Sequence, residues 1–232
     1  MMLRSANAWA LLEEFRKEFP KAPELDELAV TLAVQLEDMG DDVGARSLLV
    51  GVEGPKSSLE RGYLYLASGD VERGKETLRE SVSGLVPQDA TKVIALLDLL
   101  DRLGGDASPI VRVSVLAHRG SPDLALVELE QVLDDVPKEN HPAVLALAAR
   151  IAGEGGLPEQ AARFRTRLIR NFPRAPEVPE ATLRLARFRG ANVEGVQEAI
   201  ELLEALILKE PDGAIVPTAR RELRILRGGP ES

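Results

Sequence analysis

The sequence predicts an all-α protein built from stacked antiparallel helix pairs, and three observations support this fold class. Segments 15–33 and 168–186 are identical at 8 of 19 positions, at an offset of 153 residues, and both contain the pattern F-P-x-A-P-E. Apolar residues between the turn signals have helical spacing, and no convincing run alternates with a period of two. Prolines recur at intervals of 35, 32, 50, 36 and 38 residues, at Pro20, Pro55, Pro87, Pro137, Pro173 and Pro211. Repeats of this length are typical of helical arrays.

Helix-start and helix-stop signals divide the first half of the chain into seven predicted helices. Proline is expected just beyond a helix end, as at Pro20. Asp41 and Asp70 follow turn glycines and are predicted N-caps, and Ser57-x-x-Glu60 is a predicted capping box. We expect helices at residues 6–19, 24–39, 42–52, 57–68, 71–85, 89–103 and 108–119.

The same signals continue through the second half. Ser121 is a predicted N-cap, with Pro122 at the first helical position. Gly156 and Gly190 are expected at turns between helices. An i, i+3, i+4, i+7, i+8 stripe is formed by Ala199, Leu202, Leu203, Leu206 and Ile207. We expect helices at residues 122–135, 141–153, 158–171, 177–189, 194–209 and 214–227, which brings the total to about 12–13.

A small residue stands twelve positions before most prolines of the series. At two of these positions the residue is larger, Val43 and Lys75, but a glycine is adjacent. Because helices pack closely only where side chains are short, we expect a neighbouring helix to approach at each position. The small residues are Ala8, Ala125, Ala161 and Ala199.

The motif G-x-x-x-x-A-x11-P resembles the tetratricopeptide repeat family. It is clearest at residues 120–137 and 156–173, and the likeness covers nearly the whole chain in degenerate form. The family's aromatic positions are mostly Leu, Val and Ala here. The resemblance implies a right-handed α-solenoid over residues 1–232 with a C-terminal capping helix at 213–228. The 50-residue interval from Pro87 to Pro137 leaves room for three helices, which predicts a bend near 104–120.

The C-terminal half is also similar to repeats in bacterial envelope lipoproteins of the β-barrel assembly type. The likeness is carried by residues 167–173 and 179–181 and by Leu206-Ile207 followed by Pro211, but no lipobox cysteine is present. The compartment is therefore left open. The periplasm or cell envelope is expected if a signal segment has been removed, and the cytoplasm otherwise. The first residues look like the second helix of a repeat, which suggests a truncated N-terminus.

Composition excludes several classes of protein. The chain of 232 residues has no cysteine, so disulfide-stapled miniproteins, cysteine-ligated metal proteins and thiol enzymes are excluded. No apolar run is long enough to cross a bilayer. The net charge is -9, divided into -11 over residues 1–149 and +2 over residues 150–232. Because an acidic chain neutralises phosphates poorly, no nucleic-acid partner is expected.

Catalytic motifs are weak or absent. Residues 69–75 match G-x-x-x-x-G-K, but Glu76 follows in place of the Ser or Thr that would hold magnesium, and no buried strand precedes the loop. The only histidines are His118, expected at helix-terminal carbonyls, and His141. We therefore expect no enzyme activity, no cofactor and no metal site.

We expect a scaffold that binds a protein or peptide partner on its concave face, in an oligomeric state that the sequence leaves open. Two alternatives remain: a regulatory module from a larger signalling or transcription protein, and an enzyme with an unrecognised helical active site. In the tetratricopeptide repeat family the first helix of each pair lines the concave face. Carrying that register over, the resemblance implies partner contacts from Asp98, Asp101, His141, Glu177, Glu180, Arg184 and Arg187.

Overall fold

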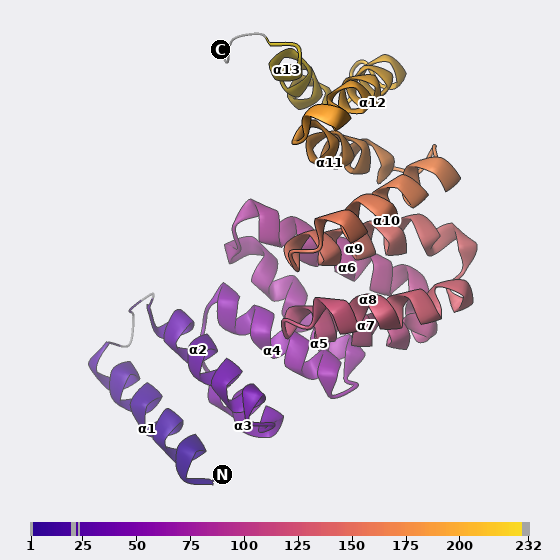
Figure 1. The fold of residues 1–232 in the computed structure, drawn as a ribbon. Coiled ribbons are helices and arrows are strands. Elements are labelled where there is room, and N and C mark those ends of the chain that lie inside the picture. The colour runs from indigo at the N-terminus through magenta and orange to yellow at the C-terminus, as the bar shows by residue number, and fades with distance from the viewer. Residues whose placement is uncertain (1, 20–21, 23, 229–232) are drawn as a thin grey trace. The chain divides into compact units, whose positions relative to one another are not determined.

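The computed structural model describes residues 2–19, 22 and 24–228, and within them it contains helices and no strand (Figure 1). The predicted all-α class is confirmed. Contacts between residues divide the chain into two compact units, Met1–His118 and Arg119–Ser232. No described helix combines the length and the apolar character that crossing a bilayer requires.

The first unit contains seven α-helices among its described residues. From α1 to α6 each helix packs against the next, and α7 packs against α4. Short 3-10 helices, η1 (Val82–Gly84) and η2 (Gly104–Ala107), follow α5 and α6. The α-helices are α1 (Met2–Glu18), α2 (Glu24–Asp38), α3 (Asp42–Leu49), α4 (Pro55–Ala67), α5 (Val71–Ser81), α6 (Pro87–Leu103) and α7 (Ser108–His118).

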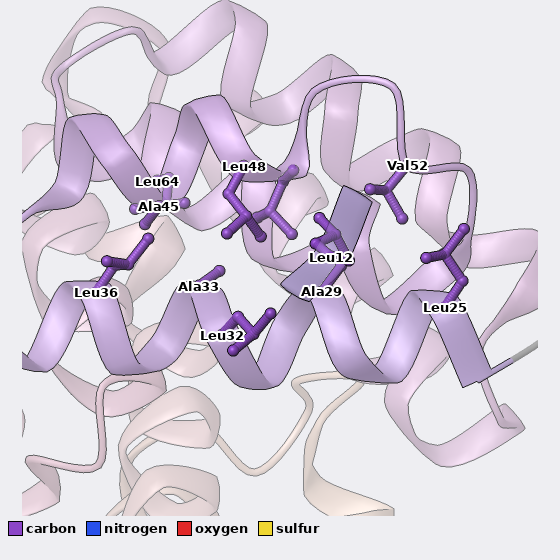
Figure 2. Packing of buried hydrophobic residues seen from close by; sticks show 11 residues of the cluster. Leu12, Leu25, Ala29, Leu32, Ala33, Leu36, Ala45, Leu48, Val52 and Leu64 are labelled. Carbon is purple, nitrogen blue, oxygen red and sulfur yellow. The ribbon is translucent and has the colours of Figure 1, made fainter. Parts of the chain in front are cut away.

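Buried aliphatic side chains from α1 to α4 form one core of this unit. Leu12 of α1, Leu48 of α3 and Leu64 of α4 are almost fully buried and gather over one face of α2 (Figure 2). That face presents residues three or four apart, as an amphipathic helix requires. On α2 they are Leu25, Ala29, Leu32, Ala33 and Leu36.

The α4–α5 pair shows how glycine allows close helix packing. A Cβ added to Gly62 would lie 2.7 Å from the Leu78 side chain, and one added to Gly74 would lie 2.6 Å from Leu66. The two contacts run in opposite sequence directions, so the helices are antiparallel. The expected close approach beside Lys75 is therefore made by the adjacent Gly74.

The second unit contains α8 to α13, and its consecutive helices also pack against one another. Three of the four expected small residues, Ala125, Ala161 and Ala199, are completely buried, while the side chain of Ala8 lies outside the described part. The α-helices are α8 (Pro122–Val132), α9 (His141–Glu154), α10 (Pro158–Asn171), α11 (Val178–Gly190), α12 (Val196–Lys209) and α13 (Val216–Leu226). The 3-10 helices are η3 (Leu133–Asp135), η4 (Lys138–Asn140) and η5 (Val193–Gly195).

Two predicted helix boundaries are wrong for one reason. Pro55 and Pro87 are the first residues of α4 and α6, two positions before the predicted starts, rather than residues that follow the preceding helix. Proline suits the first helical position because the N–H that it lacks would have no partner there. Pro20 lies outside the described residues.

The predicted capping box is also wrong. Ser57 and Glu60 lie inside α4 and are buried, and the N-cap is Gly54. The Asp26 carboxylate of α2 caps the helix instead, because Oδ2 accepts from Lys56 N at 3.0 Å and Oδ1 from Ser57 N at 2.7 Å. The two predicted aspartate N-caps are confirmed: Asp41 accepts a hydrogen bond from Gly44 N, and Asp70 accepts one from Arg73 N.

Candidate functional site

The two aspartates predicted as partner contacts in the first unit both form ion pairs. Asp98 pairs with Arg102 on the same helix, α6. Asp101 joins α6 to α5, because its carboxylate lies 2.6 Å from Lys75 Nζ and 3.3 Å from Arg79 Nη2. The hydrogen bond to Asp101, followed by the one to Glu72, raises the pKa of Lys75 above its ordinary value. Lys75, the last residue of the G-x-x-x-x-G-K match, thus stabilises helix packing.

His141, the next predicted contact, closes the turn before α9. Its Nε2 lies 2.8 Å from the carbonyl oxygen of Val136, and its ring meets the Phe172 ring edge-on with centroids 6.1 Å apart. The ring is half-buried by this packing. The observed contacts of His141 are those of a residue that holds a turn in place.

The remaining predicted residues lie on or beside α11. Arg184 donates to Glu180 one turn earlier, at 2.6 Å. Arg187 reaches Glu222 of α13 with Nη2 at 2.8 Å and Nε at 3.1 Å, and so links two helices. Glu177 precedes the helix, and one of its carboxylate oxygens is buried without a hydrogen bond. The structure therefore brings Glu180 and Arg184 together, whereas Arg187 binds Glu222 of α13.

A groove that the sequence analysis did not predict lies on the second unit, between α10 and the end of α11. Its volume is about 570 Å³. Four arginines and one glutamate supply all of its ionisable side chains, so the surface is strongly cationic. The lining residues are Glu159, Ala162, Arg163, Thr166, Arg167, Arg170, Asn171, Phe188 and Arg189.

The sequence of α10 explains why its arginines share one face. Arg163, Arg167 and Arg170 are spaced i, i+4, i+7, which places them along one side of a helix over about 10 Å. The opposite side is buried against neighbouring helices, with Ala161, Phe164 and Leu168 among its core residues. The amphipathic pattern that folds α10 into the unit thus leaves the three arginines exposed.

These three guanidinium groups lie together along one groove, and none of them is engaged by the described part of the fold. Within residues 24–228, no ion pair or hydrogen bond reaches Arg163, Arg167 or Arg170 from another described side chain. Glu159 lines the same groove but pairs with none of them. Because Arg carries a planar fork of donors suited to carboxylates and phosphates, three unused forks on one face have the chemistry to bind an anionic group.

The far wall of the groove comes from the last turn of α11. Phe188 is half-buried and supplies the aromatic surface, while Arg189 is partly buried beside it. Arg189 Nε lies 3.2 Å from Glu198 Oε2 on α12, without hydrogen-bond geometry. The fourth arginine is therefore held by a partner within the fold, and its Nε keeps an unused donor.

A further arginine of α10, Arg165, points away from the groove lining and toward α9. Its Nη2 donates to the Ala149 carbonyl at 3.3 Å. Desolvation, followed by repulsion from Arg184, lowers the pKa of Arg165 from its ordinary value, and Glu180 partly offsets this. The two sides of α10 thus differ, since Arg165 has a role in packing and the three groove arginines have none.

One sequence signal could have identified the groove. The run Arg163, Arg165, Arg167 and Arg170 is dense, but the register carried over from the repeat family directs attention to the first helix of each pair. α10 packs against α9 and follows it in the chain, so in that register its exposed face lies outside the predicted concave surface.

The chain matches no protein-family model and no curated protein. Among the described residues, no group of three or more His, Cys, Asp or Glu side chains is placed to hold a metal ion. The resemblances stated from the sequence therefore stay predictions, and the functional argument rests on the geometry of the groove.

Proposed function

We propose that this protein is a non-enzymatic interaction scaffold that binds a protein or peptide partner on its arginine-lined groove. The single observation that carries the proposal is the clustering of three exposed arginines along one groove, none of them paired with a described side chain. The charged residues that the sequence predicts as contacts differ in this respect, because Asp101 pairs with Lys75, Glu180 with Arg184, and Arg187 with Glu222. A surface whose cations are left unpaired around a hollow is suited to an external ligand.

The helical repeat architecture supports the same proposal. Consecutive helices pack side by side from α1 to α6 and from α8 to α13, and a stack of such pairs would form an α-solenoid. In a solenoid each pair completes the core of its neighbour, so exposed helix faces remain available for binding. The groove uses one of these faces, which is a second helix of a pair.

The residues that the sequence predicts as partner contacts remain a separate prediction from the groove. Arg184 and Glu180 are exposed and could exchange their mutual ion pair for partner contacts at little cost, because exposed pairs contribute only about 0–1 kcal/mol. Arg187 is less free to do so, since it would also release α13.

Affinity capture from native lysate followed by mass spectrometry tests the proposal. The bait variant Arg163→Gln/Arg167→Gln/Arg170→Gln should lose a partner that the wild type retains. The control variant Lys138→Gln/Arg220→Gln/Arg221→Gln removes the same charge from exposed residues outside the groove, and it should retain that partner. Equal capture by all three baits would contradict the proposal. A fourth bait, Arg184→Ala, tests the sequence-predicted surface separately.

A further inference from the structure

The dimensions and charges of the groove also restrict what the partner can present to it. We infer that the groove binds an acidic peptide segment, in extended form, with two or three carboxylates laid along α10. The inference rests on the proposed function and specifies the chemistry of the partner at that site.

The spacing of the arginines supports an extended segment. Arg163 and Arg167 are four residues apart, or about 6 Å along the helix axis, and Arg170 lies about 10 Å from Arg163. In an extended chain, side chains on the same face recur about every 6.6 Å. Carboxylates at alternate positions of a peptide therefore match the first two arginines directly, and the flexible third arginine can reach the next.

The size of the groove supports the same conclusion. Its volume of about 570 Å³ is in the range of pockets that hold small ligands or a few side chains. A helix with its side chains is about 10–12 Å across, so it would rest on the rim rather than enter. Phe188 and Ala162 add an apolar surface that the methylene groups of Glu side chains can cover while their carboxylates reach the arginines.

Charge complementarity favours a short acidic peptide over a nucleic acid. The cationic surface on α10 is only about 10 Å long, and Glu159 interrupts it at one end. Modules that bind single-stranded nucleic acid typically track about four or more nucleotides and stack their bases on several aromatic rings. Phe188 is the only aromatic side chain of the groove lining.

The test uses the whole chain of 232 residues and three fluorescein-labelled probes. The first is a twelve-residue Gly/Ser peptide with Glu at three alternate positions, the second is its Gln counterpart, and the third is a twelve-nucleotide oligothymidine. Fluorescence anisotropy should show binding of the Glu peptide, at least tenfold weaker binding of the Gln peptide, and weaker binding of the oligonucleotide at the same ionic strength. Raising the salt concentration from 50 to 300 mM should weaken the Glu complex severalfold, because the paired groups are exposed.

The variants separate the groove from general attraction. Arg163→Gln/Arg167→Gln/Arg170→Gln should reduce affinity for the Glu peptide at least tenfold, and Lys138→Gln/Arg220→Gln/Arg221→Gln should change it less than twofold. Circular dichroism melts check that both variants are folded. Tighter binding of the oligonucleotide than of the Glu peptide, or equal losses in the two variants, would overturn the inference. If no Glu peptide binds but lysate capture still depends on the groove arginines, this inference fails while the proposed function stands. Capture that ignores those arginines would refute both.

Discussion

Leu78 of α5 packs against the Cα of Gly62 of α4, where a Cβ would lie 2.7 Å from the leucine Cγ and Cδ2 and 3.1 Å from its backbone nitrogen. The reciprocal contact between Leu66 and Gly74 has nearly the same dimensions. Two glycines therefore set the separation of these helices, and the leucines fill the space that the missing side chains leave.

Gly62→Ala should destabilise the first unit. Alanine improves helix propensity by about 1 kcal/mol, but overpacking beside a backbone atom costs about 1–3 kcal/mol. The two effects partly offset each other, so we expect a net loss of up to about 2 kcal/mol in the free energy of unfolding, measured by urea denaturation. Gly105→Ala is the matched control, because nothing lies within 4 Å of its Cβ position. A Gly62→Ala protein as stable as the wild type would show that α4 and α5 separate easily.

Asp26→Ala should loosen the start of α4. The substitution leaves the amides of Lys56 and Ser57 without their acceptor, and Ser57 is buried. Loss of hydrogen bonds to a charged acceptor predicts a decrease of about 1–3 kcal/mol in the free energy of unfolding. Hydrogen exchange at these two amides should accelerate. Asp38→Ala, exposed on the same helix, should leave both measurements nearly unchanged; equal effects of the two substitutions would rule out the cap.

His118 and Glu60 should be energetically coupled. His118 Nε2 lies 2.9 Å from Glu60 Oε2, whose side chain is 8% exposed, and the imidazole stacks on Tyr63 with ring centroids 3.7 Å apart. A double-mutant cycle with Glu60→Ala and His118→Ala should give a coupling free energy of about 1 kcal/mol between α4 and α7. Strictly additive losses would mean that the pair contributes nothing beyond its separate packing.

The ion pair between Lys75 and Asp101 should stop stabilising the fold only at strongly alkaline pH. The folded state raises the pKa of Lys75 above 10.5. Its contribution to the free energy of unfolding is therefore fully present below pH 10.5 and is lost as the pH rises through the folded-state pKa. Lys75→Met should lower the free energy of unfolding at pH 8 by up to about 1 kcal/mol, and the difference from wild type should shrink above pH 10.5. A difference that stays constant up to pH 12 would show that the substitution acts through packing alone.

Much of the helical architecture could be predicted because it depends on local signals. Turn glycines, the Asp41 and Asp70 caps and the apolar stripes act within one or two turns of the chain, and α10 occupies 158–171 as expected. The capping of α4 could not be predicted, because the acceptor Asp26 is 31 residues from Ser57 in the sequence. The same holds for His118, which meets Glu60 rather than helix-terminal carbonyls.

The candidate site was missed for a similar reason. Whether an arginine is available to bind a partner depends on which acidic side chains the fold brings near it. The spacing of residues in the sequence alone does not reveal these neighbours. Arg187 is reached by Glu222 from 35 residues away, whereas Arg163 and Arg167 receive no described partner. Exposed helical arginines that look alike in the sequence therefore differ in whether the fold supplies an acidic partner.

Site-specific photocrosslinking tests the central claim most directly. A photoreactive amino acid in place of Thr166, which lines the groove between the arginines, should form an adduct with the captured partner. The adduct should disappear when Arg163, Arg167 and Arg170 are replaced by Gln, and the same probe at Arg184 or Arg220 should form none. An adduct at Arg184 with none at Thr166 would contradict the groove and favour the surface that the sequence alone predicts.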